Sequence, residues 1–437
     1  MKKLWILLFV SITTSLVYAQ NIEVSGGTKT PIPYTNISGS GLNNVFVLYG
    51  LENAKLTYQS STGNLLKWFK YTTNINDSLL VKSGDTFNTE LTGLENNTGY
   101  ILQDGTSIKR VWIIDYKLYE ATSLVVNSTA SLDPCSELRL TVTTQLFSMG
   151  YNEAKSGSVR RLLNIQIPVA YKSMEYSASA SAYVSKDVVL NIANLTNSNI
   201  TISEVPLMNT SFTIGDDIFA KTWGLNKSVA TPEYTAVAVN GKGTPIHVVR
   251  DAENELDKGT EDVLEGSGPF DVRFVGYANE PTASYFKWEL ATDDKFANVF
   301  TTFTDKEFQF TFSETKTYYA RFTVSNKFNS CTDSSQVFTI KVFESYLKVP
   351  RVFSPNGDGK NDVFYAEYKS IKSFHGWIFN RWGNELFTWT DPSKGWDGKV
   401  GGKYVNPGVY FYIIEAEGTD GQSHNLKGDI NVFSTQP

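Results

Sequence analysis

Histidine and cysteine are scarce in this sequence, and their scarcity excludes several kinds of catalytic and metal site. The 437 residues include 3 His and 2 Cys. None of His247, His375 and His424 stands in the His-Glu-x-x-His spacing or in another metal-ligand spacing. A Gly-x-Ser-x-Gly nucleophile elbow is also missing from the sequence. We therefore expect that this protein is not an enzyme.

Long apolar runs and an excess of positive charge are missing as well. The apolar stretch that begins at Leu4 follows Lys2 and Lys3 and leads to a small-residue cleavage pattern at Ala19, which predicts a signal peptide over residues 1–19. This stretch is too short to cross a bilayer. The formal net charge of −6 becomes −8 when the two lysines are removed with the signal peptide. An acidic protein of this kind is not expected to bind nucleic acid.

Convincing helical periodicity is absent, and short strand-like runs take its place. Aromatic residues, which fit the surface of a pleated sheet, make up 14% of the chain. Clusters of Gly, Asn, Asp, Ser and Pro separate the apolar runs, and Leu138, Leu140 and Val142 alternate with polar residues as on one buried face of a strand. We predict an all-β protein of tandem immunoglobulin-like β-sandwich domains, with a small antiparallel β-sandwich at the C-terminus.

Turn clusters and shifts in composition divide the chain into segments. We expect a signal peptide over 1–19, β-sandwich domains over 20–130 and 131–250, an acidic linker over 251–265, an immunoglobulin-like domain over 266–343 and a C-terminal domain over 344–437. The linker holds seven acidic residues and few large apolar ones, which indicates a solvated segment or a short exposed helix. Gly241-Lys242-Gly243-Thr244 lacks the spacing of a phosphate loop, so we interpret it as a hairpin turn.

The two cysteines, Cys135 and Cys331, fall in different predicted domains. A disulfide between them would close a loop of nearly 200 residues. Free cysteines are often buried, and we therefore favour two separate buried thiols, with pairing as the alternative.

The segment over 266–343 carries two aromatic patterns in a characteristic order. A strand-like run over 285–290 contains Trp288, and a second run over 312–326 contains Tyr318 and ends in Thr323-Val324-Ser325-Asn326. This arrangement resembles the PKD-type immunoglobulin-like domain, although Lys316 stands where that family usually has Gly. The resemblance implies a spacer or adhesion module without chemistry of its own.

Four short blocks rich in Gly, Asn, Asp and aromatic residues lie near the C-terminus. They contain Phe353, Pro355, Asn356, Gly357, Asp358, Gly359, Asn361, Asp362 and Phe364, then Asn380, Arg381, Trp382 and Gly383, then Trp396, Asp397 and Gly398, and finally Pro407, Gly408 and Tyr410. In this order the blocks closely resemble the gliding-motility-associated C-terminal domain, the type B sorting domain of the Bacteroidetes type IX secretion system. The resemblance implies export through the periplasm to the outer cell surface or the exterior. The implied partners are the type IX secretion machinery and an outer-membrane anchor protein.

The residues of these blocks also indicate local structure. Asn356-Gly357 and Asp358-Gly359 supply turn positions with positive φ, and Phe353 and Phe364 are expected to anchor strands on either side of that loop. The run over 381–384 predicts the tip of one hairpin, and Thr419-Asp420-Gly421 predicts the turn of a second.

Asn356, Asp358 and Asp362 follow the spacing of a short calcium loop. Oxygen ligands at alternate positions can converge on one hard cation. The alternative, which we favour because Lys360 and the lack of a bidentate Glu reduce the ligand set, is a turn whose side chains accept hydrogen bonds from their own backbone. No other cofactor is predicted.

Paired carboxylates and exposed aromatics define the remaining candidates. Asp216-Asp217 and Asp293-Asp294 lie beside turn residues, whereas a glycosidase needs two carboxyl groups that face each other across a cleft. We expect a secreted or surface protein whose β-sandwich modules serve adhesion or binding to a protein or glycan ligand. The alternative is a carbohydrate-binding accessory protein of a surface glycan-degrading system. Its candidate aromatics, which are more often core residues, are Trp68, Phe69, Tyr71 and Trp112.

Overall fold

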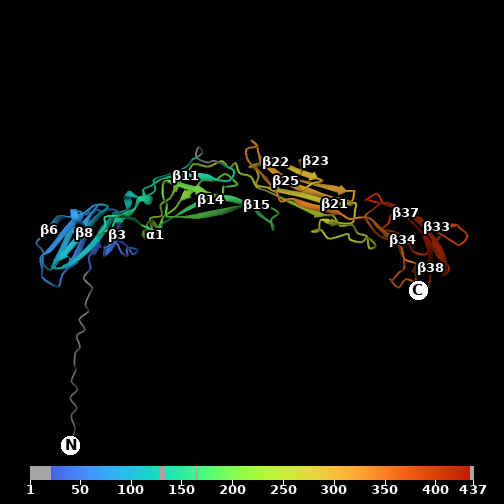
Figure 1. Ribbon diagram of the computed structural model, residues 1–437, viewed down its shortest axis with the longest axis horizontal. Helices are drawn as coiled ribbons and strands as arrows, with labels where there is room; N and C mark the ends of the chain where they lie inside the picture. The colour runs from blue at the N-terminus through green and yellow to red at the C-terminus, as the bar shows by residue number, and fades with distance from the viewer. Residues whose placement is uncertain (1–20, 128–132, 164, 434–437) are drawn as a thin grey trace, which may run out of the picture.

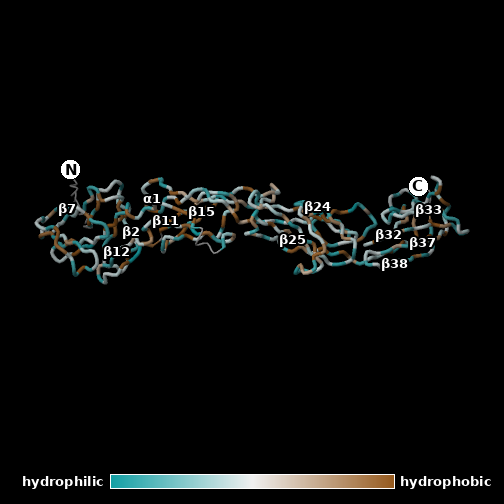
Figure 2. The backbone as a smooth tube through the Cα atoms, turned by 90° about the horizontal axis from the view of Figure 1, so that it is seen from above, coloured by the Kyte–Doolittle hydropathy of each residue, from teal (hydrophilic) through white to brown (hydrophobic). Residues whose placement is uncertain are grey.

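The protein is a row of four β-sandwich domains. The computed structural model describes residues 21–127, 133–163 and 165–433, so the predicted signal peptide lies outside the described residues. The domains follow one another in a long bowed row, with the first domain at one end and the C-terminal domain at the other (Figure 1). Hydrophobic residues are distributed through all four domains rather than gathered in one (Figure 2). The predicted all-β class of tandem sandwiches is confirmed.

The first domain packs a three-stranded sheet against a six-stranded one. Its strands are β1 (Glu23–Ser25), β2 (Ile32–Tyr34), β3 (Asn44–Leu48), β4 (Lys55–Gln59), β5 (Leu66–Tyr71), β6 (Leu79–Ser83), β7 (Asn88–Thr92), β8 (Thr98–Asp104) and β9 (Ser107–Asp115). The strand orders are β1-β4-β7 and β2-β3-β9-β8-β5-β6. Leu56, Trp68 and Val111 are fully buried between the sheets, and the Trp68 indole N–H donates to the Thr89 hydroxyl at 3.0 Å.

The second domain contains two main sheets, a small two-stranded sheet and a short helix. Its elements are β10 (Ser123–Val126), β11 (Leu138–Thr143), β12 (Gly150–Asn152), β13 (Val159–Arg161), β14 (Gln166–Ser177), β15 (Ala182–Ala193), β16 (Asn199–Ile202), β17 (Thr213–Ile214), α1 (Ile218–Trp223) and β18 (Val229–Ala230). The sheets run β10-β11-β16, β15-β14-β17-β18 and β12-β13. Leu138, Leu140 and Val142 are buried as predicted. Because β10 pairs with β11, strand pairing starts this domain earlier than the expected boundary at residue 131.

A single hydrophobic core joins the first and second domains. Val45, Tyr71 and Trp112 project from the six-stranded sheet of the first domain on the side away from its own sandwich core. They belong to the same buried cluster as Leu140 and Phe212 of the second domain. The six-stranded sheet is therefore covered on both faces, and the two domains form one packed unit.

The third domain contains β19 to β27. These strands are β19 (Gly241–His247), β20 (Glu265–Gly266), β21 (Phe270–Ala278), β22 (Ala283–Ala291), β23 (Val299–Phe303), β24 (Glu307–Phe312), β25 (Thr317–Asn326), β26 (Thr332–Ser334) and β27 (Phe338–Val342). One sheet runs β19-β21-β24 and the other β20-β27-β25-β22-β23, with β26 on β25. Trp288, Phe274 and Phe322 are fully buried in its core.

The interpretation of residues 241–244 as a hairpin turn was wrong, because they belong to β19. A Cβ atom at Gly243 would lie 2.7 Å from the Trp288 ring, and one at Gly241 would lie 2.8 Å from Val324. The absence of a side chain at these two positions of β19 therefore allows Trp288 and Val324 to pack closely against the strand, and it does not indicate a turn.

The C-terminal domain has a core of its own. Its strands are β28 (Tyr346–Lys348), β29 (Val352–Phe353), β30 (Phe364–Tyr365), β31 (Glu367–Lys369), β32 (Ile371–Phe379), β33 (Glu385–Trp389), β34 (Gly395–Trp396), β35 (Lys399–Val400), β36 (Lys403–Tyr404), β37 (Gly408–Gly418) and β38 (Ser423–Val432). The main sheet runs β29-β38-β37-β32-β33, and both predicted hairpins, β32–β33 and β37–β38, are present. The sheet is not wholly antiparallel, because β29 runs parallel to β38. No helix in the described part of the chain combines the length and apolar character needed to cross a membrane.

A disulfide joins the second and third domains. Cys135 and Cys331 are bonded, with their Cα atoms 5.5 Å apart, so our preference for two separate thiols was wrong. The turn that carries Cys331 lies against the second domain, because Cys331 and Asp333 line one surface pocket with Cys135, Tyr176 and Glu204. Cys135 and Cys331 are 196 residues apart in the sequence but lie close together in space, because the second and third domains are neighbours.

We predict that the folded, exported protein contains no free thiol and releases two on reduction. Replacing both cysteines with serine should lower the free energy of unfolding of the disulfide-linked domains by about 2–4 kcal/mol, because the unfolded chain loses its cross-link. Thiol titration and denaturant unfolding measure these two effects. Two reactive thiols in protein purified from an oxidising compartment would contradict the pairing.

Candidate functional site

All four C-terminal sequence blocks meet at one end of the main sheet of their domain. In the sheet register, Gly408 lies opposite Val432 and Phe411 lies opposite Phe379. The end of β29, the end of β32 and the start of β37 therefore lie at the same end of the sheet. We call this region, which consists of residues 353–364, 380–384, 396–398 and 407–410, the motif end.

Three of the blocks pack together through buried and half-buried aromatic side chains. The Phe353 ring lies 5.9 Å from Phe364 and 5.4 Å from Trp396, and the Trp396 ring lies 5.6 Å from Tyr410. Gly398 has φ +75°, and a Cβ atom there would lie 2.7 Å from a ring carbon of the buried Pro355. These residues form a compact cluster that holds the motif end together, and Phe353 and Phe364 anchor the loop between them as predicted.

The loop between Phe353 and Phe364 folds on its own side chains. The Asp362 carboxylate accepts backbone N–H groups from Gly357 at 2.6 Å and Gly359 at 2.7 Å, and these bonds hold the pKa of Asp362 below its usual value. Asn356 accepts the Asp358 N–H, and Asp358 accepts the Lys360 N–H. The three calcium candidates thus cap their own backbone. Across 21–127, 133–163 and 165–433, no group of three or more His, Cys, Asp or Glu residues has a metal-binding arrangement.

Several other exposed members of the blocks shape or cap the backbone. Asn361 and Gly408 have φ of +52° and +150°, Pro407 precedes Gly408, and the Asp397 carboxylate accepts the Lys399 N–H at 3.1 Å. In the turn over 380–384, by contrast, the large Trp382 side chain is 72% exposed.

The opposite end of the C-terminal domain is docked on the third domain by the acidic segment. Glu255 is buried, forms an ion pair with Arg250 and accepts the Ser267 hydroxyl at 2.6 Å. The Asn254 amide donates to the carbonyls of Ala366 at 2.7 Å and Pro392 at 2.6 Å. The predicted solvated linker is therefore wrong at these positions, although the other six acidic residues are exposed.

Further buried hydrogen bonds complete this contact, which we call the polar seam. The Ser370 backbone N–H donates to the Ser267 hydroxyl at 2.8 Å, and the Gly268 N–H donates to the Ser370 hydroxyl at 2.9 Å. Thr315 and Thr419 hydroxyls lie 2.7 Å apart. Because Thr419 lies in the turn after β37, the seam occupies the end of the sheet opposite the motif end.

The carboxylate pairs that could have indicated catalysis have structural roles. Asp217 caps α1 by accepting the N–H groups of Phe219 at 2.8 Å and Ala220 at 3.1 Å, and it also accepts the Tyr116 hydroxyl at 2.6 Å. Burial raises the pKa of Asp217. Asp216 accepts the Asn226 and Lys227 N–H groups.

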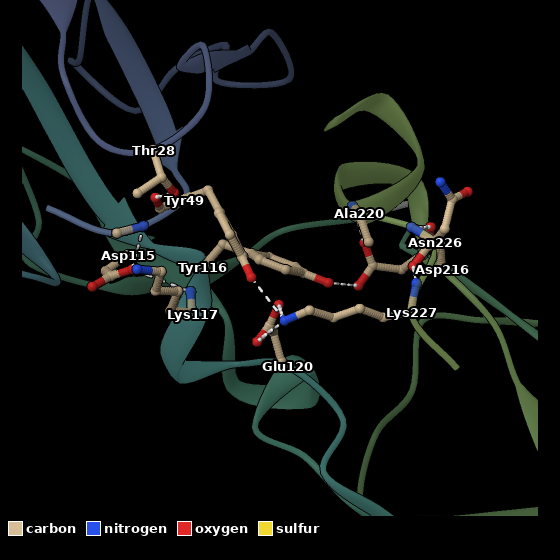
Figure 3. A network of polar contacts seen from close by, with 12 residues as sticks. Thr28, Tyr49, Asp115, Tyr116, Lys117, Glu120, Asp216, Ala220, Asn226 and Lys227 are labelled. Atoms are coloured by element: carbon tan, nitrogen blue, oxygen red, sulfur yellow. Dashed lines mark hydrogen bonds and ion pairs between the residues drawn. The ribbon is translucent and has the colours of Figure 1, made fainter. Parts of the chain in front are cut away.

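The same network links the first two domains. The Lys227 ammonium group bonds the Tyr49 hydroxyl at 2.7 Å and the Glu120 carboxylate at 2.8 Å (Figure 3).

In the second carboxylate pair, Asp293-Asp294, the Asp293 carboxylate accepts three backbone N–H groups of its own turn. The two pairs also lie in different domains.

The aromatic side chains nominated for stacking on sugars do not form an exposed platform. Trp68, Tyr71 and Trp112 are 0%, 2% and 2% exposed, and Phe69 is half-buried. These rings are core residues and are not available to stack on a sugar ring.

Comparison with known families identifies the C-terminal domain. Residues 347–432 match the CHU_C type IX secretion signal domain, over nearly the same span as β28 to β38. The C-terminal domain is a type IX secretion signal domain. Such a domain implies export by type IX secretion, contact with that machinery, and delivery to the cell surface or the exterior.

Residues 127–231 match a fibronectin type III domain, which agrees with the sandwich of the second domain. No curated protein matches this chain. A crystal structure of the chicken CNTN1 FN1–FN3 domains aligns with 72% of this chain and 98% of the chicken chain, at 9% sequence identity. The TM-score of 0.24 is too low to support a conclusion about this protein.

We predict that Glu255→Ala loosens the polar seam. Removing the carboxylate takes one partner from Arg250 and one from the Ser267 hydroxyl. Because Arg250 is 35% exposed, the expected loss is on the order of 2 kcal/mol rather than that of a fully buried pair. Hydrogen exchange should accelerate at Leu256 and Tyr368, whose backbones bond across the seam. Glu253→Ala is the control, since Glu253 is exposed in the same segment. Equal exchange in both variants would contradict this role of Glu255.

We predict that Asp217→Asn removes a pH-dependent cost of folding. A carboxyl group whose pKa is raised in the folded state stabilises the fold most when protonated, so wild type should lose stability relative to Asp217→Asn as pH rises above about 4. Asp217→Ala should cost about 1–3 kcal/mol, because it leaves buried partners unsatisfied. Unfolding measured from pH 3 to 8 separates the variants, and parallel profiles for wild type and Asp217→Asn would contradict the prediction.

Proposed function

We propose that this chain is a non-enzymatic cargo of type IX secretion whose β-sandwich domains form a binding or adhesion arm. The observation that carries the proposal is the secretion signal domain over 347–432, whose four blocks converge on its free end. The domain has its own core and sits at the end of the row (Figure 1). The arm is displayed outside the cell or released from it.

The three preceding domains suit a spacing and binding role. The shared core, the disulfide and the polar seam each fix one junction, which favours a stiff arm over a flexible string. The aromatic order of the third domain favours a PKD-like module. The structural use of Asp216, Asp217 and Asp293 supports a function without catalysis. An outer-membrane anchor protein is the partner we propose for surface retention.

Export of two forms tests this proposal. We predict that the full chain reaches the outside of a host with type IX secretion, whereas a form lacking residues 344–437 accumulates in the periplasm. Fractionation and immunoblotting measure the distribution. Formation of the Cys135–Cys331 bond in the truncated form is the control for folding, because that disulfide lies outside the deleted region. Equal delivery of both forms would reject the proposal.

A further inference from the structure

The hairpin tip between β32 and β33 presents the Trp382 indole to solvent, whereas the other aromatic side chains of the motif end are buried or half-buried. Phe353, Phe364 and Trp396 are 0–2% exposed and Tyr410 is half-buried, whereas Trp382 is 72% exposed. An exposed indole gains nothing from the hydrophobic effect in the isolated domain. The Trp382 side chain is therefore available to a partner without any loss to the core of its own domain.

The backbone beneath Trp382 is held by a dense set of hydrogen bonds. The Asn380 side-chain oxygen accepts the N–H groups of Trp382 and Asn384, both at 3.0 Å. The Asn380 N–H donates to the Asn384 carbonyl, and the Gly383 N–H donates to the Asn380 carbonyl. Gly383 has φ +81° with open space around it. The tip is thus preorganised, which lowers the entropic cost of binding through it.

A cation accompanies the exposed indole. The Arg381 guanidinium carbon lies 4.5 Å from the centre of the Trp382 ring. Within the described residues, Arg381 forms no ion pair, although the chain contains more acidic than basic residues. An unpaired guanidinium stacked on an exposed indole is complementary to an apolar slot with a carboxylate at its rim.

We propose that the Arg381–Trp382 tip is the contact through which a protein of the secretion machinery recognises the signal domain. This inference rests on the proposed function and assigns the roles within the four blocks: three blocks build the motif end, and the second one binds. The polar seam occupies the other end of the sheet, so the tip is free while the domain is attached to its cargo.

The charge of the tip favours a protein partner over a membrane surface. Peripheral attachment to anionic lipid relies on a cluster of several Lys or Arg residues. Here a single arginine is followed within the same turn by Asn384 and then by Glu385, and the net charge of the chain is −6. Tryptophan and arginine are the residue types that most often dominate the energetics of protein–protein interfaces.

The test measures export of full-length variants in a host with type IX secretion. Trp382→Ala should lower the exported fraction about tenfold or more, the scale of losing a central interface tryptophan, while leaving the melting temperature unchanged. Arg381→Glu should lower export as well, because it opposes an acidic rim. Trp382→Phe should restore part of the export. The control is Phe328→Ala, which removes a 71% exposed aromatic from the third domain and should export normally.

The outcomes separate this inference from the proposed function. Normal export of Trp382→Ala, with retention of the form lacking 344–437, overturns the role of the tip and leaves the proposed function standing. Export of the truncated form overturns the proposed function itself. Binding of the purified full chain to vesicles of phosphatidylethanolamine and phosphatidylglycerol, lost in Trp382→Ala, would replace the protein partner by a membrane surface. Loss of export in Phe328→Ala would show a general effect of surface aromatics and also overturn the inference.

Discussion

The buried polar seam between the third and C-terminal domains determines which surface of the signal domain is free. Glu255, Ser267 and Ser370 exchange hydrogen bonds where both domains exclude water. Charged and polar groups in such a place are costly when unpaired, so the seam favours one geometry and penalises others. That geometry commits one end of the main sheet to the cargo and leaves the motif end outward. Any partner that recognises the four blocks therefore meets them on the attached domain.

The three junctions use three different kinds of chemistry, and each suits its place in the row. The first two domains share an apolar core, which makes their association part of folding. The second and third domains are joined by a covalent bond between Cys135 and Cys331. The third and fourth retain separate cores and meet through hydrogen bonds and the Lys369–Asp257 ion pair. A polar contact of this kind supplies orientation more than it supplies net stability.

Much of the fold could be predicted from the sequence, because period-two alternation and turn residues are local signals. Leu138, Leu140 and Val142 are buried as their alternation indicated, and both C-terminal hairpins are present. The turn predicted at Gly243 is absent, because a neighbouring tryptophan rather than a turn excludes a side chain there. The aromatic content gave no information about exposure, so Trp68 and Trp112 were nominated for ligand binding although both are core residues.

The features that escaped prediction are those that depend on tertiary contacts rather than on local sequence. Glu255 has the same chemistry as its six acidic neighbours in 251–265, and only the approach of Arg250 and Ser267 distinguishes it. The pairing of Cys135 with Cys331 likewise requires knowing that the β25–β26 turn faces the second domain.

That disulfide also bears on where the protein folds. Structural disulfides persist in oxidising compartments and are rare in the reducing cytosol. An interdomain bond forms correctly only once the second and third domains have come together, because the cysteines belong to different sandwiches. The covalent link therefore fits a protein that leaves the cytosol, as the C-terminal signal domain implies. The oxidised junction at the centre of the row and the signal at its end indicate the same path by independent chemistry.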